Sequence, residues 1–333
     1  MSITQQDVAR ESGVSISTVC LVLRDDPRIS DRTRQRVLEN ATALGYVART
    51  SLRAVGGHQH LGVLLANPSG HPSADTFFGE VLHGITEEAE LQGQTVSIAA
   101  FDGAEPPRLA RENRVHGLIL GGTPIHPAFV ERVRAMTVPS VFIGRYAGHL
   151  RLSAVLTDNS AGGQLATEHL LQLGRRQIAF VSGPLERALY ADRLDGFLRA
   201  HREADVAPGV VRHGEATVEG GFQMVTELLS GGAALDALFI AEDVMALGAL
   251  RALKARGVRV PEDIAVVGYS DVHLAGLSDP PLTTVHVARR RLGRSAARLI
   301  GDLLSGNLEG PIHVTVPPKL VVRASCGARI DSS

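Results

Sequence analysis

The first 46 residues of this chain contain two short amphipathic stretches separated by a single glycine. In the segment Asp7-Val-Ala-Arg-Glu-Ser-Gly-Val-Ser-Ile-Ser-Thr-Val19, Gly13 stands between the two stretches. Glycine adopts positive φ angles freely, which a tight turn between two helices requires. The pattern predicts a helix-turn-helix, a layout that places one helix in the major groove of DNA.

The expected helices carry residues suited to capping their first turns. Thr4 followed by Asp7 resembles a capping box, Ser15 can cap the second helix, and Ser30 can cap a third. Apolar residues at helical spacing are expected to form a small common core: Val8, Val14, Val19, Val37, Leu38 and Leu44. A three-helix domain that binds another protein is the alternative that this pattern leaves open.

The charge of the segment is compatible with binding to DNA phosphates. Residues 1–60 contain eight Arg and six acidic residues, a net charge of +2. The whole chain of 333 residues has a net charge of −1 at pH 7. Any binding to DNA is therefore expected to be local to this end of the chain.

From Leu61 onward, short apolar segments alternate with amphipathic helical segments. The expected strands are apolar, and several are bounded by glycine: Leu61–Ala66, Thr95–Ala100, Gly117–Leu120, Val141–Ile143, Gln177–Val181, Ala237–Ile240 and Ile264–Val267. Buried parallel strands covered by helices show this pattern. The sequence therefore predicts an α/β fold with two doubly wound parallel-sheet subdomains after the three-helix headpiece.

Motifs along nearly the whole chain carry a family resemblance. Ser17-Thr-Val19 and Leu44-Gly-Tyr46 resemble the headpiece of the lactose/galactose repressor (LacI/GalR) family of bacterial transcriptional regulators. Six later segments match this family in the same order: Thr167–Gly174, Arg193–Phe197, Asp243–Leu250, Val260–Tyr269, Pro280–Val285 and Leu320–Arg323. The resemblance implies an operator-binding regulator, with a repressor expected, and a core similar to periplasmic sugar-binding proteins.

The resemblance also implies a division of the chain. We expect a DNA-binding headpiece at 1–48, a hinge helix or linker at 49–60, and an effector-binding and dimerisation core at 61–333. Within the core, the N-subdomain is expected at about 61–157 and 286–317, and the C-subdomain at about 160–284 and 320–333. The chain is then expected to cross between the subdomains three times.

Residues near the start of the second helix are expected to read the operator. Ile16, Ser17 and Leu21 are the candidates for contacts with base edges. Family members commonly have Arg where this chain has Leu21, so the usual guanine contact is predicted to be replaced by apolar contact with a thymine methyl. Inward packing of Leu21 is the alternative. The candidates for phosphate contacts, which position the protein, are Thr4, Ser15, Thr18 and Arg24.

The expected hinge departs from the family pattern. Family members usually have Pro-Asn after the conserved Tyr, and a Leu that wedges into the minor groove. The matching residues here are Ala48, Arg49 and Val55. Because Val is smaller than Leu, we expect a weaker wedge, which Arg49 and Arg53 could offset by contacts in the minor groove or with phosphates.

The resemblance places an effector site in the cleft between the two subdomains. Two departures concern its polar groups: the family's Asn-Asp pair is Glu242-Asp243, and the first Asp of its Asp-Asp pair is Ser270, next to Asp271. The predicted effector residues are aromatic, acidic, basic or hydroxyl-bearing: Phe77, Phe78, Asp158, Arg187, Arg193, Glu242, Asp243, Ser270 and Asp271. Each of the polar ones could instead cap a helix or bond within a loop. A sugar, a nucleoside or another small polar metabolite remains open as the effector.

Several other classes of protein are disfavoured. No apolar run approaches the roughly 20 residues that span a bilayer, and the first residues lack the features of a signal peptide. We therefore expect a cytoplasmic protein. The family resemblance, with its two-fold operators, implies a homodimer, with a tetramer also open. No cofactor motif, metal-ligand cluster or nucleophile elbow is found, so an enzyme is not expected. A small-molecule-binding protein of the periplasmic type, without DNA-linked regulation, is the alternative reading.

Overall fold

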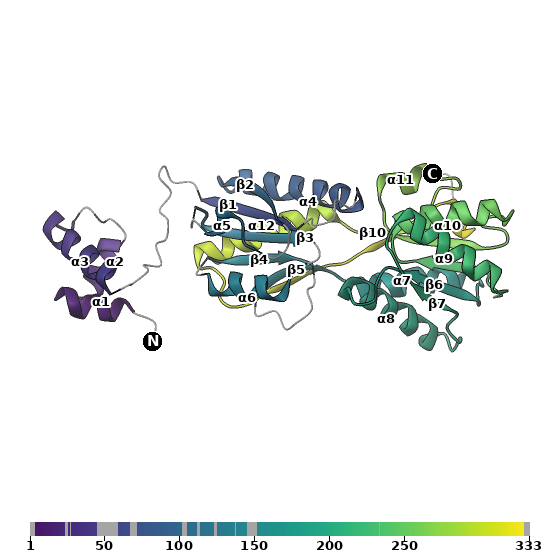
Figure 1. Cartoon of the computed structure of the whole chain (residues 1–333), viewed down its shortest axis with the longest axis horizontal. Helices are drawn as coiled ribbons and strands as arrows, with labels where there is room; N and C mark the ends of the chain where they lie inside the picture. Colours follow the sequence, from purple (N-terminus) through teal and green to yellow (C-terminus); the bar gives the residue numbers. More distant parts are fainter. Residues whose placement is uncertain are drawn as a thin grey trace.

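The computed structural model describes residues 4–23, 26, 28–44, 59–66, 72–101, 105–111, 114–122, 125–136, 138–144, 152–232 and 234–329 (Figure 1). These residues form a three-helix headpiece and two α/β units, each built around one six-stranded sheet. The predicted limits at residues 48 and 60 adjoin or fall among residues outside this set, so they stay predictions. None of the helices formed by the described residues is long and apolar enough to cross a membrane.

The headpiece consists of α1 (Gln5–Ser12), α2 (Ile16–Leu23) and α3 (Asp31–Ala43). The capping box is present, because Thr4 accepts from the Asp7 amide and the Asp7 carboxylate accepts from the Thr4 amide. Gly13 ends α1 in the left-handed region at φ 61°. The buried core of these helices is entirely aliphatic: Val8, Ala9, Val19, Val22, Val37 and Ala41.

The prediction that Leu38 belongs to this core is wrong. Val37, Ala41 and Leu44 occupy one face of the helical wheel, and Leu38 lies about 100° away from Val37. Its side chain is consequently 45% exposed.

Sheet A forms the first α/β unit, which we call the N-subdomain. Its strands are parallel and lie in the order β11-β5-β4-β3-β1-β2. Their bounds are β1 (His60–Ala66), β2 (Thr95–Phe101), β3 (Gly117–Gly122), β4 (Ser140–Ile143), β5 (Ser153–Thr157) and β11 (His313–Val316). Helices α4 (Pro72–Leu91) and α12 (Arg289–Ser305) cover one face, while α5 (Arg108–Arg111) and α6 (Pro127–Ala135) cover the other.

Sheet B forms the second unit, the C-subdomain. Its order is β12-β10-β9-β8-β6-β7, and β12 alone runs antiparallel to its neighbour. The strands are β6 (Ile178–Ser182), β7 (Val211–His213), β8 (Ala237–Ile240), β9 (Ala265–Ser270), β10 (Thr283–His286) and β12 (Lys319–Val321). One face is covered by α7 (Asn159–Gln172) and α8 (Ala188–Glu203), the other by α9 (Val218–Ser230) and α10 (Asp243–Ala255). A short helix, α11 (His273–Leu277), follows β9.

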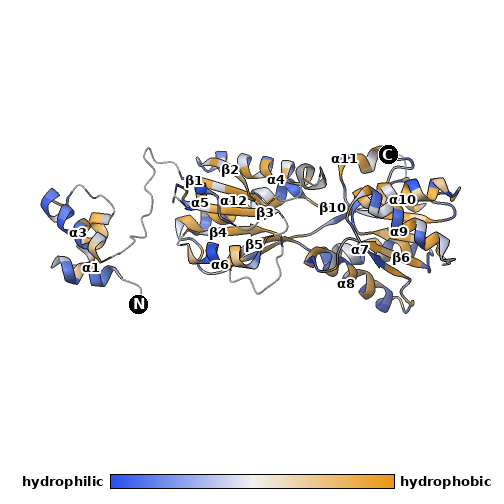
Figure 2. Cartoon of the chain, viewed as in Figure 1, coloured by the Kyte–Doolittle hydropathy of each residue, from blue (hydrophilic) through white to orange (hydrophobic). Residues whose placement is uncertain are grey.

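Apolar residues are concentrated in the strands and on the helix faces turned toward them (Figure 2). This is the distribution that a parallel sheet buried on both faces requires. The predicted fold class is therefore confirmed. The strands that the sequence analysis did not single out include β7, β11 and β12, which pair on one side only or carry partly exposed residues.

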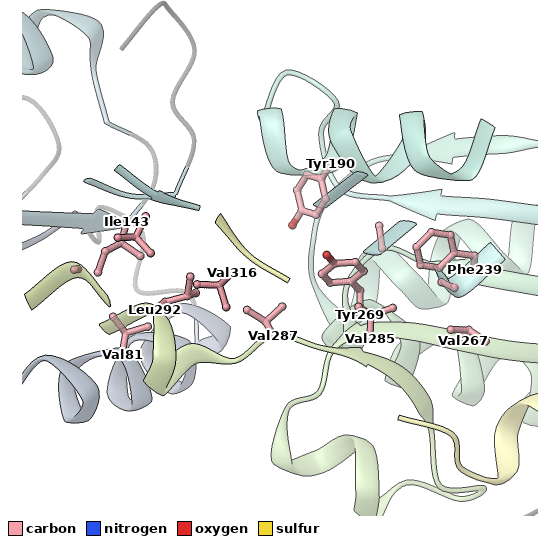
Figure 3. Close-up of a cluster of buried hydrophobic side chains, with 14 of the residues drawn as sticks. Val81, Ile143, Tyr190, Phe239, Val267, Tyr269, Val285, Val287, Leu292 and Val316 are labelled. Atoms are coloured by element: carbon pink, nitrogen blue, oxygen red, sulfur yellow. The ribbon is translucent and has the colours of Figure 1, made fainter. Parts of the chain in front are cut away.

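The chain crosses between the subdomains after β5, after β10 and between β11 and β12. Each crossing leaves the carboxyl end of a strand, so the carboxyl ends of both parallel sheets lie at the boundary between the subdomains. One buried cluster is continuous across this boundary. Figure 3 shows Val287 and Val316 between Ile143 and Leu292 on one side and Tyr269 and Val285 on the other.

Candidate functional site

The predicted DNA-reading residues lie on and around α2. Ile16 is 44% exposed and Ser17 is also exposed, so both side chains are available to a partner. Leu21 is half-buried and does not belong to the headpiece core cluster, so contact with bases stays a prediction and inward packing stays the alternative. The first residues of α2 therefore present one apolar and one hydroxyl side chain to solvent.

The predicted phosphate-contacting residues have local roles as well. Thr4 is exposed and caps α1. Ser15 accepts from the Thr18 amide at 3.0 Å, and the two hydroxyls are 2.9 Å apart, so this pair stabilises the start of α2. Both hydroxyls keep lone pairs and their position at the helix N-terminus, which suits a phosphate. The predictions for Arg24, Arg49, Arg53 and Val55 lie outside the described residues.

A connected polar network surrounds Arg193, which α8 carries toward the boundary between the subdomains. Its Nε donates to Asn159 Oδ1 at 3.0 Å, and its Nη1 donates to Glu242 Oε2 at 3.1 Å and to the Ala241 carbonyl. The side chain is only 7% exposed and that of Glu242 17%. A buried charge at this depth needs an opposite charge and several hydrogen bonds, and Arg193 has both.

Ser270 completes this network on the next strand. Its hydroxyl donates to Glu242 Oε1 at 3.1 Å, so both oxygens of Glu242 are held by the protein. Although position 270 carries a serine, a carboxylate thus lies within hydrogen-bond distance of it, that of Glu242. Arg193, Glu242 and Ser270, three predicted effector residues, are brought together.

Two buried tyrosine rings lie beside the network. The Arg193 guanidinium lies 3.7 Å from the ring centroid of Tyr269 and 5.6 Å from that of Tyr190. Burial raises the pKa of Tyr269 to about 12, and burial with the nearby Glu242 also raises the pKa of Tyr190, so both rings stay neutral. Their hydroxyls point toward the N-subdomain side of the boundary (Figure 3).

The carboxylate of Asp243 is bonded within the protein. Its side chain is completely buried, Oδ1 accepts from the Thr284 hydroxyl at 2.7 Å, and Oδ2 accepts from the Val272 amide at 3.0 Å. Burial raises its pKa to about 6. Asp243 therefore braces the loop after β9 and presents no carboxylate surface to a ligand, in contrast to its neighbour Glu242.

Asp158 and Asp271 are also engaged with the protein. Asp158 Oδ1 caps α7 by accepting from the Ala161 amide at 2.9 Å. Asp271 accepts from Arg323 Nη2 at 2.7 Å and pairs with His286 Nδ1 at 2.9 Å. Although burial opposes it, these hydrogen bonds and charges lower the pKa of Asp271. The first role of each carboxylate is therefore to shape the boundary.

The N-subdomain contributes Phe77 and Phe78 from the first turns of α4. Their rings pack edge to face with centroids 5.2 Å apart, and both are partly buried. The ring of Phe78 also lies against Gly121 of β3, where an added Cβ would be only 2.7 Å from it. In the C-subdomain, the half-buried Arg187 directly precedes α8, three residues before Tyr190.

Four residues of this site were not predicted from the sequence. Tyr190 lies one helical turn before Arg193, and Tyr269 directly precedes Ser270. Asn159 and His286 lie next to the carboxyl ends of β5 and β10. A search of both sides of each strand end, and one helical turn around each predicted arginine, would have found all four. Among the residues that the structure describes, no three His, Cys, Asp or Glu side chains form a metal-binding group.

Comparison with protein families identifies both parts of the chain. Residues 4–48 match the family of bacterial regulatory proteins, lacI family. Residues 167–326 match the periplasmic binding protein-like domain. The first match covers the three helices of the headpiece, and the second covers most of the C-subdomain together with α12 and β11 of the N-subdomain.

Individual relatives cover nearly the whole chain. The HTH-type transcriptional regulator CelR of Thermobifida fusca is 32% identical over 336 residues, spanning 97% of this chain and 98% of the relative. The HTH-type transcriptional repressor CytR of Escherichia coli strain K12 is 31% identical, spanning 98% and 96%.

Solved structures agree with these relatives. A CelR–cellobiose complex has a TM-score of 0.73 at 30% identity, covering 97% of this chain and 99% of that one. The Lac repressor dimer bound to operator and an anti-inducer has a TM-score of 0.71 at 28% identity, covering 98% and 100%. The chain therefore belongs to the LacI family of bacterial transcriptional regulators.

Proposed function

We propose that this protein is a cytoplasmic, homodimeric repressor that binds operator DNA and is controlled by a small polar molecule bound between its subdomains. The observation that carries the effector part is the network of Arg193, Glu242 and Ser270 beside two tyrosine rings. The three-helix headpiece carries the DNA-binding part of the proposal. No catalytic activity is proposed.

The chemistry of the network favours a neutral ligand with several hydroxyl or amide groups. Arg193 and Glu242 neutralise each other, and Asp271 is already paired with Arg323. A charged ligand would have to break one of these pairs, whereas a sugar or nucleoside can hydrogen-bond to them without doing so. The relatives support this choice, since CelR was solved with cellobiose and a LacI-family regulator from Enterococcus faecium with ribose.

DNA binding can be tested with the DNA upstream of the protein's own coding region. We expect the full chain to shift this fragment in a gel, and a chain lacking residues 1–58 to leave it free. A scrambled DNA fragment of equal length, and a series of salt concentrations for both chains, separate specific from non-specific binding. Equal shifts by the full and truncated chains would show that the headpiece does not carry the binding to DNA. No shift by either chain would favour a protein that only binds small molecules.

Ligand binding can be tested by thermal unfolding in the presence of a panel of sugars and nucleosides. A ligand at about 100 times its Kd stabilises the folded state by about 2.7 kcal/mol, which gives a clear rise in Tm. We expect Arg193→Met to remove this rise, measured as the difference between Tm with and without ligand. A compound that raises the Tm of the parent protein and that of Arg193→Met equally would be shown to bind elsewhere.

Replacing Leu21 by Arg is expected to change which operator is preferred. Leu21 has no hydrogen-bond donor, whereas Arg can donate twice to guanine O6 and N7, a contact that contributes about 1–3 kcal/mol of discrimination. Selection from random DNA should then yield sites with a new guanine in each half-site for Leu21→Arg. Arg10→Ala, on the exposed surface of α1, serves as a control for a general change in charge. Unchanged preference after selection would show that Leu21 does not face the bases.

A further inference from the structure

Arg289 is a buried arginine that joins the two subdomains. It is the first residue of α12, which packs on sheet A, and only 5% of it is exposed. Its Nη1 donates to the carbonyl of Ser270 at 2.9 Å, and its Nη2 donates to the carbonyl of Asp271 at 2.8 Å. A helix of the N-subdomain is thus bonded to the end of β9 in the C-subdomain.

The two carbonyls belong to an unusual turn. Ser270 and Asp271 have φ angles of 120° and 56°, a region that non-glycine residues rarely adopt. Such a conformation persists only where its surroundings hold it in place. Arg289 supplies two charge-assisted hydrogen bonds to this turn, and the Asp271 amide donates to Thr284 Oγ1 at 3.4 Å.

The turn sets the side chains that face the proposed ligand. Ser270 directs its hydroxyl to Glu242, which in turn holds Arg193. Asp271 directs its carboxylate to His286 and Arg323. A rotation of the Ser270–Asp271 backbone would therefore move the polar groups of the site.

The same guanidinium group of Arg289 also lies near the helix pair of the N-subdomain. Its Nη2 lies 4.0 Å from Glu80 on α4. The next residue, Arg290, lies so close to α4 that a Cβ on Gly84 would be 2.1 Å from its carbonyl oxygen. A movement of α4 against sheet B would consequently be transmitted to Arg289 through backbone contact.

We propose that Arg289 is the positioning residue that couples the Ser270–Asp271 turn to the orientation of the N-subdomain. Ligand contacts that shift this turn change the two hydrogen bonds to Arg289, and hence the angle of α12 and α4 relative to sheet B. Regulation by a ligand rests on the proposed function above, but the coupling itself is a property of the chain without ligand or DNA.

The neighbouring residue provides a matched control. Arg290 lies in the same turn of α12 and donates to Glu87 at 3.0 Å through both Nε and Nη2, but this partner belongs to its own subdomain. Arg290→Met therefore removes an ion pair of α12 without touching the boundary. Arg289→Lys keeps a positive charge and a donor at the boundary.

The test is a distance measurement by pulsed electron paramagnetic resonance on the full-length protein. Spin labels are attached at Glu131→Cys on α6 and Glu219→Cys on α9, in a Cys20→Ser background that leaves the buried Cys326. We expect one narrow distance distribution for the parent and for Arg290→Met, and an about twofold broader or shifted one for Arg289→Met. Arg289→Lys is expected to fall between them.

Circular dichroism of each variant shows whether it is folded, and if Arg289→Met is not, Arg289→Lys alone decides. A distribution for Arg289→Met, or in that case for Arg289→Lys, that matches Arg290→Met would overturn the proposal. Because the measurement uses neither ligand nor DNA, that result would leave the proposed function standing. A failure of the gel-shift and thermal-shift tests above would equally leave the coupling standing.

Discussion

Gly84→Ala is expected to destabilise the N-subdomain by about 2–3 kcal/mol and to lower Tm by about 5–10 °C. Alanine normally stabilises a helix relative to glycine by about 1 kcal/mol, but at this position α4 and α12 touch through their backbones. A Cβ at Gly84 would lie 2.1 Å from the Arg290 carbonyl oxygen. In the same way, a Cβ at Gly293 on α12 would lie 2.0 Å from the Val81 carbonyl oxygen. Backbone atoms cannot rotate away, so the helices must separate.

The same helix offers an internal control. Gly79 is exposed on α4, and a Cβ there would meet nothing within 4 Å. Gly79→Ala should therefore raise stability by up to about 1 kcal/mol. Differential scanning calorimetry of both variants checks that stability falls in Gly84→Ala and rises in Gly79→Ala. A loss of stability in Gly79→Ala equal to that in Gly84→Ala would show that the cost is not due to the contact with α12.

Asp243→Asn is expected to change how stability depends on pH. Burial raises the pKa of Asp243 from its ordinary 3.8 to about 6 in the folded state. The carboxyl of Asp243 then binds a proton more tightly in the folded protein than in the unfolded chain. Its contribution to the free energy of unfolding is therefore complete below pH 3.8 and is lost as pH rises through about 6. A shift of this size corresponds to about 3 kcal/mol across that window. Asn cannot ionise, and this decline should disappear.

Urea unfolding at several pH values between 4.5 and 7.5 measures this effect as the difference between the parent and Asp243→Asn. Asp279, whose side chain is 87% exposed, provides the control Asp279→Asn, the same substitution at the surface. Asp243→Ala should cost several kcal/mol at the acid end, because it leaves the Thr284 hydroxyl and Val272 amide unpaired in the interior. A difference for Asp243→Asn that does not vary with pH would mean that Asp243 titrates normally.

The fold could be predicted from the sequence because its signals are local. The capping box at Thr4, the glycine turn at Gly13 and the apolar strands of sheets A and B are each set by neighbours in the chain. Leu38 was misplaced because an apolar residue at helical spacing does not reveal which face the other helices cover. Strand β11 pairs with β5, some 160 residues away, and such pairing leaves little trace in four residues.

The candidate site was predictable only in part. The family motifs located Arg193, Glu242 and Ser270, but the sequence could not show that Asp243 turns inward while its neighbour turns toward the boundary. That choice depends on Thr284 and Val272, which reach Asp243 only after β8, β9 and β10 are assembled. Arg289 was invisible for the same reason, since its partners are main-chain carbonyls.

The pairing of Ser270 with Glu242 has a consequence for how regulators of this type are sorted by effector. A serine at a position where an Asp is expected reads as the loss of an acceptor, yet here the carboxylate of Glu242, at the start of α10, accepts from that serine. A chain can therefore keep a carboxylate at this place while lacking one at the usual position in the sequence. Regulators of this type are better grouped by the atoms that surround the bound molecule than by letters at fixed positions.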